Sequence, residues 1–250
     1  MAVTETEQPN FPAIKWNWDS ANYFADWHEP IYELMARYVP AGSTVLEVGA
    51  GGSHTLAAIA GRLKCNSYGV EPDENGIAKT RELADLESGS VKMIRGDGFH
   101  LPFPDGVFDV VYSLGLIEHF SVEAGIEMVK EHFRVCGQNG SVIVAVPNFY
   151  DLSHTVRKIF LGKGYEYFPE RSFAPFELQR VVESVGASPA ILDGSSPFWG
   201  IRMSKHGQTL TAALEHFGIK SRADKIGTAK WRARFGFLVY AIAKKGRAQT

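Results

Sequence analysis

Apolar runs rich in β-branched and aromatic residues alternate, over the first 150 residues, with stretches whose apolar residues recur at helical spacing. This alternation is typical of an α/β domain built around a mostly parallel sheet. Strands are predicted over residues 43–50, 65–71, 90–97, 107–114 and 140–148. Helices are predicted over residues 20–39, 53–63, 73–86 and 122–135. The sequence therefore predicts strands joined by helical connections.

The pattern is less regular after residue 148. A helix is predicted over 174–186, and two further strands over 188–194 and 234–245. No internal repeat is present, so we predict one domain over residues 1–250. Its parts are a tail (1–19), a core (40–148) and two insertions that form a lid with the N-terminal helix (149–173 and 195–231).

The composition is that of an ordinary globular protein, with 45% hydrophobic and 22% charged residues. The first ten residues lack the basic and apolar regions of a leader peptide, and no apolar run reaches the roughly 18 residues of a membrane span. The two cysteines, Cys65 and Cys136, are far apart and in no ligand cluster, which indicates neither a disulfide nor a zinc site. We expect a cytoplasmic protein without membrane contact.

Charge is distributed unevenly along the chain. The formal net charge of −2 disfavours a general nucleic-acid binder, but the segment from Trp199 to the C-terminus holds 11 Lys and Arg against 2 acids. Such a segment attracts acidic substrates or phosphate groups, or forms a solvated outer face. The solvated face is the favoured interpretation.

A glycine-rich turn follows the first predicted strand, in the sequence "VLEVGAGGS" over 45–53. Dinucleotide sites place a pyrophosphate at such a turn, where the helix N-terminus favours an anion. The carboxylate of Glu47 would repel that group. It suits instead a cationic ligand, such as S-adenosylmethionine, whose amino-acid part carries an ammonium beside a sulfonium.

Two further acids end the next two predicted strands. Glu71, in "YGVEPDENG", can accept hydrogen bonds from both ribose hydroxyls. Asp97, in "IRGDGFHLPF", can accept from an adenine amino group. Because parallel strands bind ligands at their carboxyl ends, Glu47, Glu71 and Asp97 are expected around one crevice.

These motifs, with "GDGFHLPFPDGVFDVVYSLGLIEHF" and "RVCGQNGSVIVAVPN", resemble those of the class I S-adenosylmethionine-dependent methyltransferases, in particular the methyltransferase type 11 group. The resemblance covers roughly residues 40 to 150. It implies a Rossmann-like, doubly wound sheet of seven strands with the last strand antiparallel and helices on both faces.

The resemblance also implies cofactor contacts that follow the strand ends in order. The methionine portion is bordered by Glu47, Gly49, Gly51 and Ser53, and the ribose by Glu71 and Pro72. The adenine is bordered by Asp97, Gly98 and Phe99, and the sulfonium end by Ser113 and Leu114. Ser53 stands where the family commonly has a third glycine, so this contact is made by its hydroxyl or is lost.

Methyl transfer needs mainly orientation, and a base only where the acceptor must lose a proton. His119, in "GLIEHF", is the candidate base, and a structural role for it is equally open. Some quinone-modifying relatives bind a metal through an acid three residues before the Glu-His pair. Here that residue is Gly115, so no metal is predicted.

Acceptor contacts are expected from the helix and the insertions, where aromatic and basic side chains gather. The candidates are Tyr23, Trp27, His28, Tyr150, His154, Trp199 and Arg202. For the aromatic side chains of the insertions a role in packing alone is at least as well supported, and for His28 and His154 a packing or surface role is favoured.

The function predicted is transfer of a methyl group to a small molecule, with oxygen the favoured acceptor atom and nitrogen or carbon left open. The alternatives are a methyltransferase that acts on RNA through its basic C-terminal segment, a non-catalytic cofactor-binding protein, and a nicotinamide-dependent dehydrogenase, which Glu47 disfavours. A monomer and a homodimer remain equally open.

Overall fold

The computed structural model describes residues 25–151, 171–185, 190–195 and 227–246. Its centre is a seven-stranded sheet in the order β3-β2-β1-β4-β5-β7-β6. The strands are β1 (Thr44–Val48), β2 (Asn66–Glu71), β3 (Val91–Arg95), β4 (Phe108–Leu114), β5 (Cys136–Pro147), β6 (Ile191–Gly194) and β7 (Leu238–Lys244). The first five strands are mutually parallel, whereas β7 lies antiparallel between β5 and β6.

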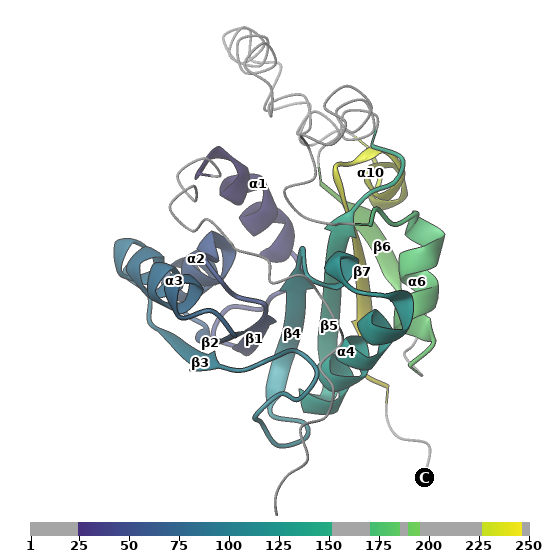
Figure 1. Cartoon of the computed structure of the whole chain (residues 1–250). Helices are drawn as coiled ribbons and strands as arrows, with labels where there is room; N and C mark the ends of the chain where they lie inside the picture. The colour runs from purple at the N-terminus through teal and green to yellow at the C-terminus, as the bar shows by residue number, and fades with distance from the viewer. Residues whose placement is uncertain (1–24, 152–170, 186–189, 196–226, 247–250) are drawn as a thin grey trace, which may run out of the picture.

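Helices cover both faces of the sheet (Figure 1). They are α1 (Ala25–Met35), α2 (His54–Arg62), α3 (Glu74–Leu86), the 3-10 turn η2 (Ile117–His119), α4 (Val122–Val135), α6 (Pro175–Glu183) and α10 (Ala229–Phe235). Helices α1, α2 and α3 pack on one face, and α4 and α6 pack on the other. Among the described residues, no helix has the length and apolar character needed to cross a membrane.

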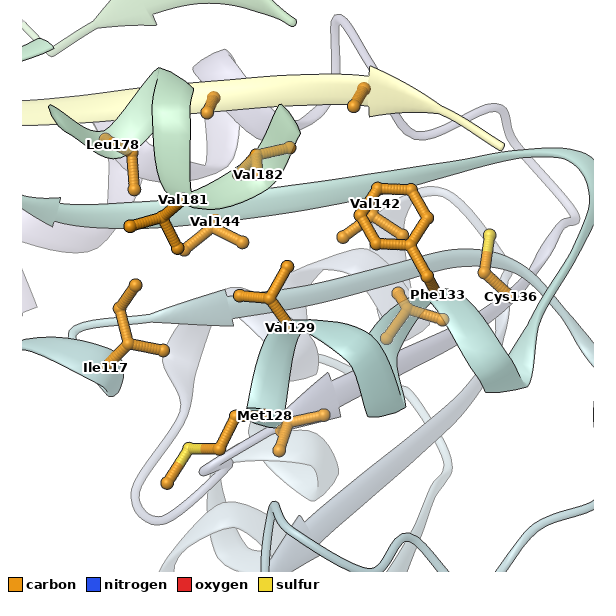
Figure 2. Packing of buried hydrophobic residues seen from close by; sticks show 14 of the residues in the cluster. Ile117, Met128, Val129, Phe133, Cys136, Val142, Val144, Leu178, Val181 and Val182 are labelled. Carbon is orange, nitrogen blue, oxygen red and sulfur yellow. The ribbon is translucent and has the colours of Figure 1, made fainter. Parts of the chain in front are cut away.

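The two faces are built by alternate residues of the same strands, as the two-residue period of a strand requires. In β4, Val110 and Tyr112 face α1 and α2, while Val111 faces α4. Figure 2 shows the core on the α4 and α6 face of the sheet, in which Val129 of α4 and Val182 of α6 gather with Val144 of β5. The parallel strands are buried on both sides, which explains their nearly continuous apolar sequences.

The strand order reverses between β1 and β4, because the chain proceeds outward from β1 through β2 to β3 and then returns to pair β4 with the other side of β1. At such a reversal the connections diverge and leave a crevice at the carboxyl ends of the strands. The fold therefore places Glu47 and Ser113, near the ends of β1 and β4, at a ligand-binding position.

The predicted seven-stranded fold with an antiparallel last strand is confirmed, and several strand boundaries differ, most of all the starts of β5 and β7. β5 begins at Cys136 rather than at residue 140, because Cys136 pairs with Phe108 before the register shifts, although the polar sequence after it indicates a turn. The last strand begins at Leu238 rather than at residue 234, because α10 extends to Phe235.

The imidazole of His132 is enclosed between α4 and the sheet. It is fully buried, its Nδ1 lies 2.7 Å from the Met128 carbonyl oxygen, and its Nε2 has no hydrogen-bond partner among the described residues. Burial lowers the pKa of His132 to about 4. An unfolded histidine has a pKa of about 6.5, so between these two values the unfolded chain binds more protons than the folded chain. The free energy of unfolding therefore decreases as the pH is lowered from about 6.5 to about 4.

His132→Leu is therefore expected to reduce the acid-induced loss of stability by up to about 3 kcal/mol between pH 7 and pH 4. The measurement is urea unfolding followed by circular dichroism at several pH values. His100→Gln is the control, because the His100 side chain is 90% exposed. Equal pH dependence in His132→Leu and the wild type would contradict the assignment.

Candidate active site

The glycine turn after β1 is held against β2 and α3 by its backbone. The amides of Gly49 and Ala50 donate to the Val70 carbonyl at 2.9 and 3.1 Å, and the amide of Gly52 donates to the Gly76 carbonyl at 3.1 Å. Gly49 has a φ of +75°, and a Cβ there would lie 3.0 Å from the Leu116 side chain. The positive φ therefore favours glycine at this position, and a Cβ there would also press on the Leu116 side chain.

Glu47 lies in β1 just before this turn and is 2% exposed. Its Oε2 accepts hydrogen bonds from the Ser53 hydroxyl at 2.6 Å and from the Tyr112 hydroxyl at 2.8 Å. Ser53 also caps α2, because its Oγ accepts from the Leu56 amide at 3.0 Å. Ser53, which stands where the family commonly has a third glycine, thus holds the Glu47 carboxylate and caps α2.

Glu71, the last residue of β2, is 5% exposed and fastens the same turn. Its Oε2 accepts from the Gly51 amide and its Oε1 from the Asp73 amide, both at 3.0 Å. Burial raises the pKa of the Glu71 carboxyl, while the two backbone donors oppose that shift. Each oxygen has a second lone pair left for a ligand hydroxyl.

Asp97 lies two residues beyond β3, not at its end as predicted, because the strand stops at Arg95. Its Oδ1 accepts from the amides of Phe99 and His100 at 2.8 and 3.0 Å, so this carboxylate caps a turn. A Cβ at Gly98 would lie 3.1 Å from Val48, which places the turn directly over the end of β1.

The other predicted cofactor contacts lie at the ends of β2 and β4. Pro72 follows β2, and its carbonyl accepts from Arg95 Nε at 3.3 Å. Ser113 is fully buried on the α4 side, and its Oγ has no partner among the described residues. Leu114 is partly buried on the α1 side, in register with Ala145.

Glu118 and His119 lie in the 3-10 turn that follows β4. Glu118 is the more enclosed of the two, at 4% exposed, and its Oε1 would lie 3.4 Å from a Cβ at Gly115. His119 is partly exposed. Among the described residues no group of three or more His, Cys, Asp and Glu side chains is arranged to hold a metal ion.

The predicted acceptor contacts are only partly described. Tyr23, His154, Trp199 and Arg202 lie outside the described residues. Trp27 lies on α1, with its side chain also outside them. Tyr150 is 46% exposed after β5, and its ring meets that of Phe149 edge to face at 5.6 Å between centroids.

His28 on α1 stacks on His54, the first residue of α2, with ring centroids 3.6 Å apart. Burial lowers the pKa of His28 to about 3, and the neighbouring His54 acts in the same direction. The His28 ring is therefore neutral near pH 7 and packs α1 against α2. Its Nε2 has no hydrogen-bond partner among the described residues.

A family model described as a methyltransferase domain, of the type 11 group, matches residues 46–144, which include the carboxyl ends of β1, β2, β3 and β4. Over this core the chain is similar to the family of class I S-adenosylmethionine-dependent methyltransferases. The cofactor of this family is S-adenosylmethionine. The site fits its amino-acid end, because the buried Glu47 carboxylate lies beside the glycine turn and has no cation paired with it among the described residues.

Several methyltransferases are similar to the chain. Ajmaline N-methyltransferase of Rauvolfia serpentina is 28% identical over 146 residues, which are 58% of this chain and 44% of the relative. The tRNA (carboxymethyluridine(34)-5-O)-methyltransferase of Schizosaccharomyces pombe is 26% identical over 192 residues, which are 74% of this chain and 76% of the relative. The chain thus spans less than half of the first relative's length.

A solved structure of a methyltransferase from Thermotoga maritima superposes with a TM-score of 0.60 at 18% identity. The match covers 91% of this chain and 92% of the other. At this level of identity the similarity establishes the methyltransferase fold alone.

Two residues of this site, Tyr112 and Thr80, are not predicted from the sequence. The Tyr112 hydroxyl bonds Glu47 across 65 residues of sequence, which only the pairing of β1 with β4 reveals. Thr80 of α3 accepts from the Ser53 amide at 3.0 Å and donates to the Ala50 carbonyl at 2.5 Å. The alternation of residues along β4 predicts that Tyr112 lies on the same face as Val110, but it does not predict the contact with Glu47.

Proposed function

We propose that this chain transfers a methyl group from S-adenosylmethionine to a small organic acceptor, with oxygen the favoured acceptor atom. The observation that carries the proposal is the buried Glu47 carboxylate beside the glycine turn at the point where strand order reverses. A carboxylate there suits the ammonium of the cofactor's amino-acid end and opposes a pyrophosphate.

The residues divide the binding task by position. Glu47 faces the methionine end, and Glu71 offers its remaining lone pairs to the ribose. The loop that contains Asp97 borders the adenine, as it passes over the end of β1. When bound, S-adenosylmethionine supplies a methyl group already activated by a positive sulfur, so the protein contributes mainly orientation.

The relatives include proteins named for transfer to nitrogen, oxygen and carbon, among them a sterol 24-C-methyltransferase of Aspergillus fumigatus. The preference for a small molecule rests on the formal net charge of −2, which disfavours a nucleic acid, and on the aromatic acceptor candidates. The preference for oxygen rests on His119, a candidate base for a hydroxyl acceptor. It is tested by incubating the protein with a metabolite extract and labelled S-adenosylmethionine and identifying the methylated product by mass.

RNA is the second candidate acceptor, favoured by the Schizosaccharomyces pombe relative, whose name specifies a tRNA and whose match covers 74% of this chain. The basic C-terminal segment contributes less to this alternative than its sequence indicates. Arg232 is paired with Asp193 at 2.8 Å, and its side chain is only 12% exposed, so it is not available to a phosphate.

Cofactor binding is tested by calorimetric titration with S-adenosylhomocysteine and, separately, with NADH. Binding of the first and not of the second is expected. NADH binding without S-adenosylhomocysteine binding would replace the proposal by a dehydrogenase function, and labelling of tRNA alone would replace the small-molecule acceptor.

His119→Ala is expected to lower the methyl-transfer rate by about 10²-fold or more if the acceptor is a hydroxyl, since loss of a general base has this magnitude. S-adenosylhomocysteine affinity should stay unchanged. The rate is measured with the acceptor that the extract identifies, and His100→Ala on the exposed surface is the control. A full rate in His119→Ala would assign that histidine a structural role.

A further inference from the structure

The two oxygens of the Glu47 carboxyl have different surroundings. Oε2 accepts from both the Ser53 hydroxyl and the Tyr112 hydroxyl, at 2.6 and 2.8 Å. Oε1 has no hydrogen-bond partner among the described residues. The two donors occupy the lone pairs of Oε2, so Oε1 is the oxygen that remains for a proton or for a ligand donor. The acid proton of the free protein and the N–H donor of a ligand therefore compete for Oε1.

The surroundings of Glu47 favour the protonated carboxyl in the free protein. Burial, opposed by the two hydroxyl donors and aided by the charge of Glu71, raises the pKa of Glu47 to about 7. No cation among the described residues is paired with Glu47. Tyr112 stays a donor at neutral pH, because burial raises the pKa of its phenol well above the usual range.

On this face of the sheet, no charged group among the described residues compensates the charge of Glu47. Glu71 of the adjacent β2 is the acid that acts on it, and Tyr112 projects from the adjacent β4. On the helices of this face, His28 of α1 stacks on His54 of α2, and its lowered pKa keeps its ring neutral. Arg62, near the end of α2, is engaged by Glu29 and Glu87.

We propose that the cofactor's ammonium group displaces a proton from Oε1 of Glu47, and that Tyr112 and Ser53 act as positioning residues that direct both to this oxygen. This inference rests on the proposed function. The step is balanced: the O–H bond of Glu47 breaks, the proton passes to solvent, and the carboxylate receives an N–H donor of the ammonium. Cofactor affinity therefore decreases as the pH falls below neutrality.

The test is calorimetric titration of the full chain with S-adenosylhomocysteine, at several pH values, in pairs of buffers that differ in ionisation enthalpy. The number of protons released follows from the difference between the buffers. We expect about one proton released per molecule bound near pH 6, and release close to zero near pH 8.5.

Two substitutions assign the proton. Glu47→Gln mimics the protonated carboxyl, since the amide oxygen accepts from Ser53 and Tyr112 while the NH₂ group takes the place of Oε1; it should abolish the release and weaken binding by about 10²-fold. Tyr112→Phe removes a donor to the charged form and should raise the midpoint pH of release by about 1 to 2 units. Tyr240→Phe is the matched control, because Tyr240 is equally buried on the same face of the sheet and its hydroxyl has no partner among the described residues.

The outcomes separate this inference from the proposed function. Tight binding without proton release at any pH, or unchanged release in Glu47→Gln, overturns the inference and leaves the function standing. Absence of S-adenosylhomocysteine binding at every pH overturns both. The wild-type measurement decides even if a variant does not fold.

Discussion

Asp193→Ala is expected to lower the free energy of unfolding by about 3–5 kcal/mol, because it leaves a nearly buried guanidinium without its partner. Asp193 is 1% exposed in β6. Its carboxylate accepts from Arg232 Nε and Nη2, both at 2.9 Å, from the Tyr38 hydroxyl at 2.8 Å and from the Gly194 amide at 2.7 Å. The cluster joins β6 and α10 to the turn that follows α1.

The effect of Asp193→Ala is measured by urea unfolding followed by circular dichroism. Glu82→Ala is the matched control, because Glu82 forms an ion pair with Lys79 but its side chain is 61% exposed, and such pairs contribute below about 1 kcal/mol. The double variant Asp193→Leu, Arg232→Met should regain most of the lost stability, since apolar residues replace the buried pair without an orphaned charge. Equal effects of Asp193→Ala and Glu82→Ala would show that the cluster adds little.

Glu71→Gln is expected to weaken S-adenosylhomocysteine binding by about 10²-fold or more, since truncation of a buried, charge-assisted contact has this magnitude. Both Glu71 oxygens accept from backbone amides, of Gly51 and of Asp73. A glutamine must turn its NH₂ group toward one of these two amides. That backbone N–H then faces another N–H donor and loses its acceptor. The change thus displaces the glycine turn and removes an acceptor for the ribose.

Calorimetric titration measures the affinity of Glu71→Gln, and thermal unfolding checks that the variant is folded. Glu74→Gln is the control, because Glu74 lies three residues further along the chain with its side chain 63% exposed. Wild-type affinity in Glu71→Gln would mean that Glu71 holds neither the turn nor the ligand.

The parts of the site that the sequence predicts depend on local chemistry. Glu47 and Glu71 lie at strand ends beside turns, and strand ends follow from two-residue periodicity and glycine positions. Parallel pairing then brings them together without further information. The predicted position of Asp97 at the end of a strand is wrong, because β3 ends at Arg95 and Asp97 caps the turn that follows.

The parts that the sequence does not predict depend on contacts between distant residues. Tyr112 reaches Glu47 through the register of two strands, and Asp193 meets Arg232 from an element on the far side of an insertion. The early start of β5 likewise depends on Phe108 as a partner for Cys136. The pattern of apolar residues predicts which face of the sheet these residues lie on, but not which distant residue each one contacts.

The position of β7 between β5 and β6 has a consequence for biosynthesis. In the described part of the chain β6 pairs only with β7, which follows it in the sequence. While β7 is still within the ribosome, β6 has no neighbour in the sheet and β5 exposes one edge. Because non-local strand pairing must await the later segment, the nascent chain completes this sheet only after β7 has emerged, and an unpaired edge is open to aggregation or chaperones until then.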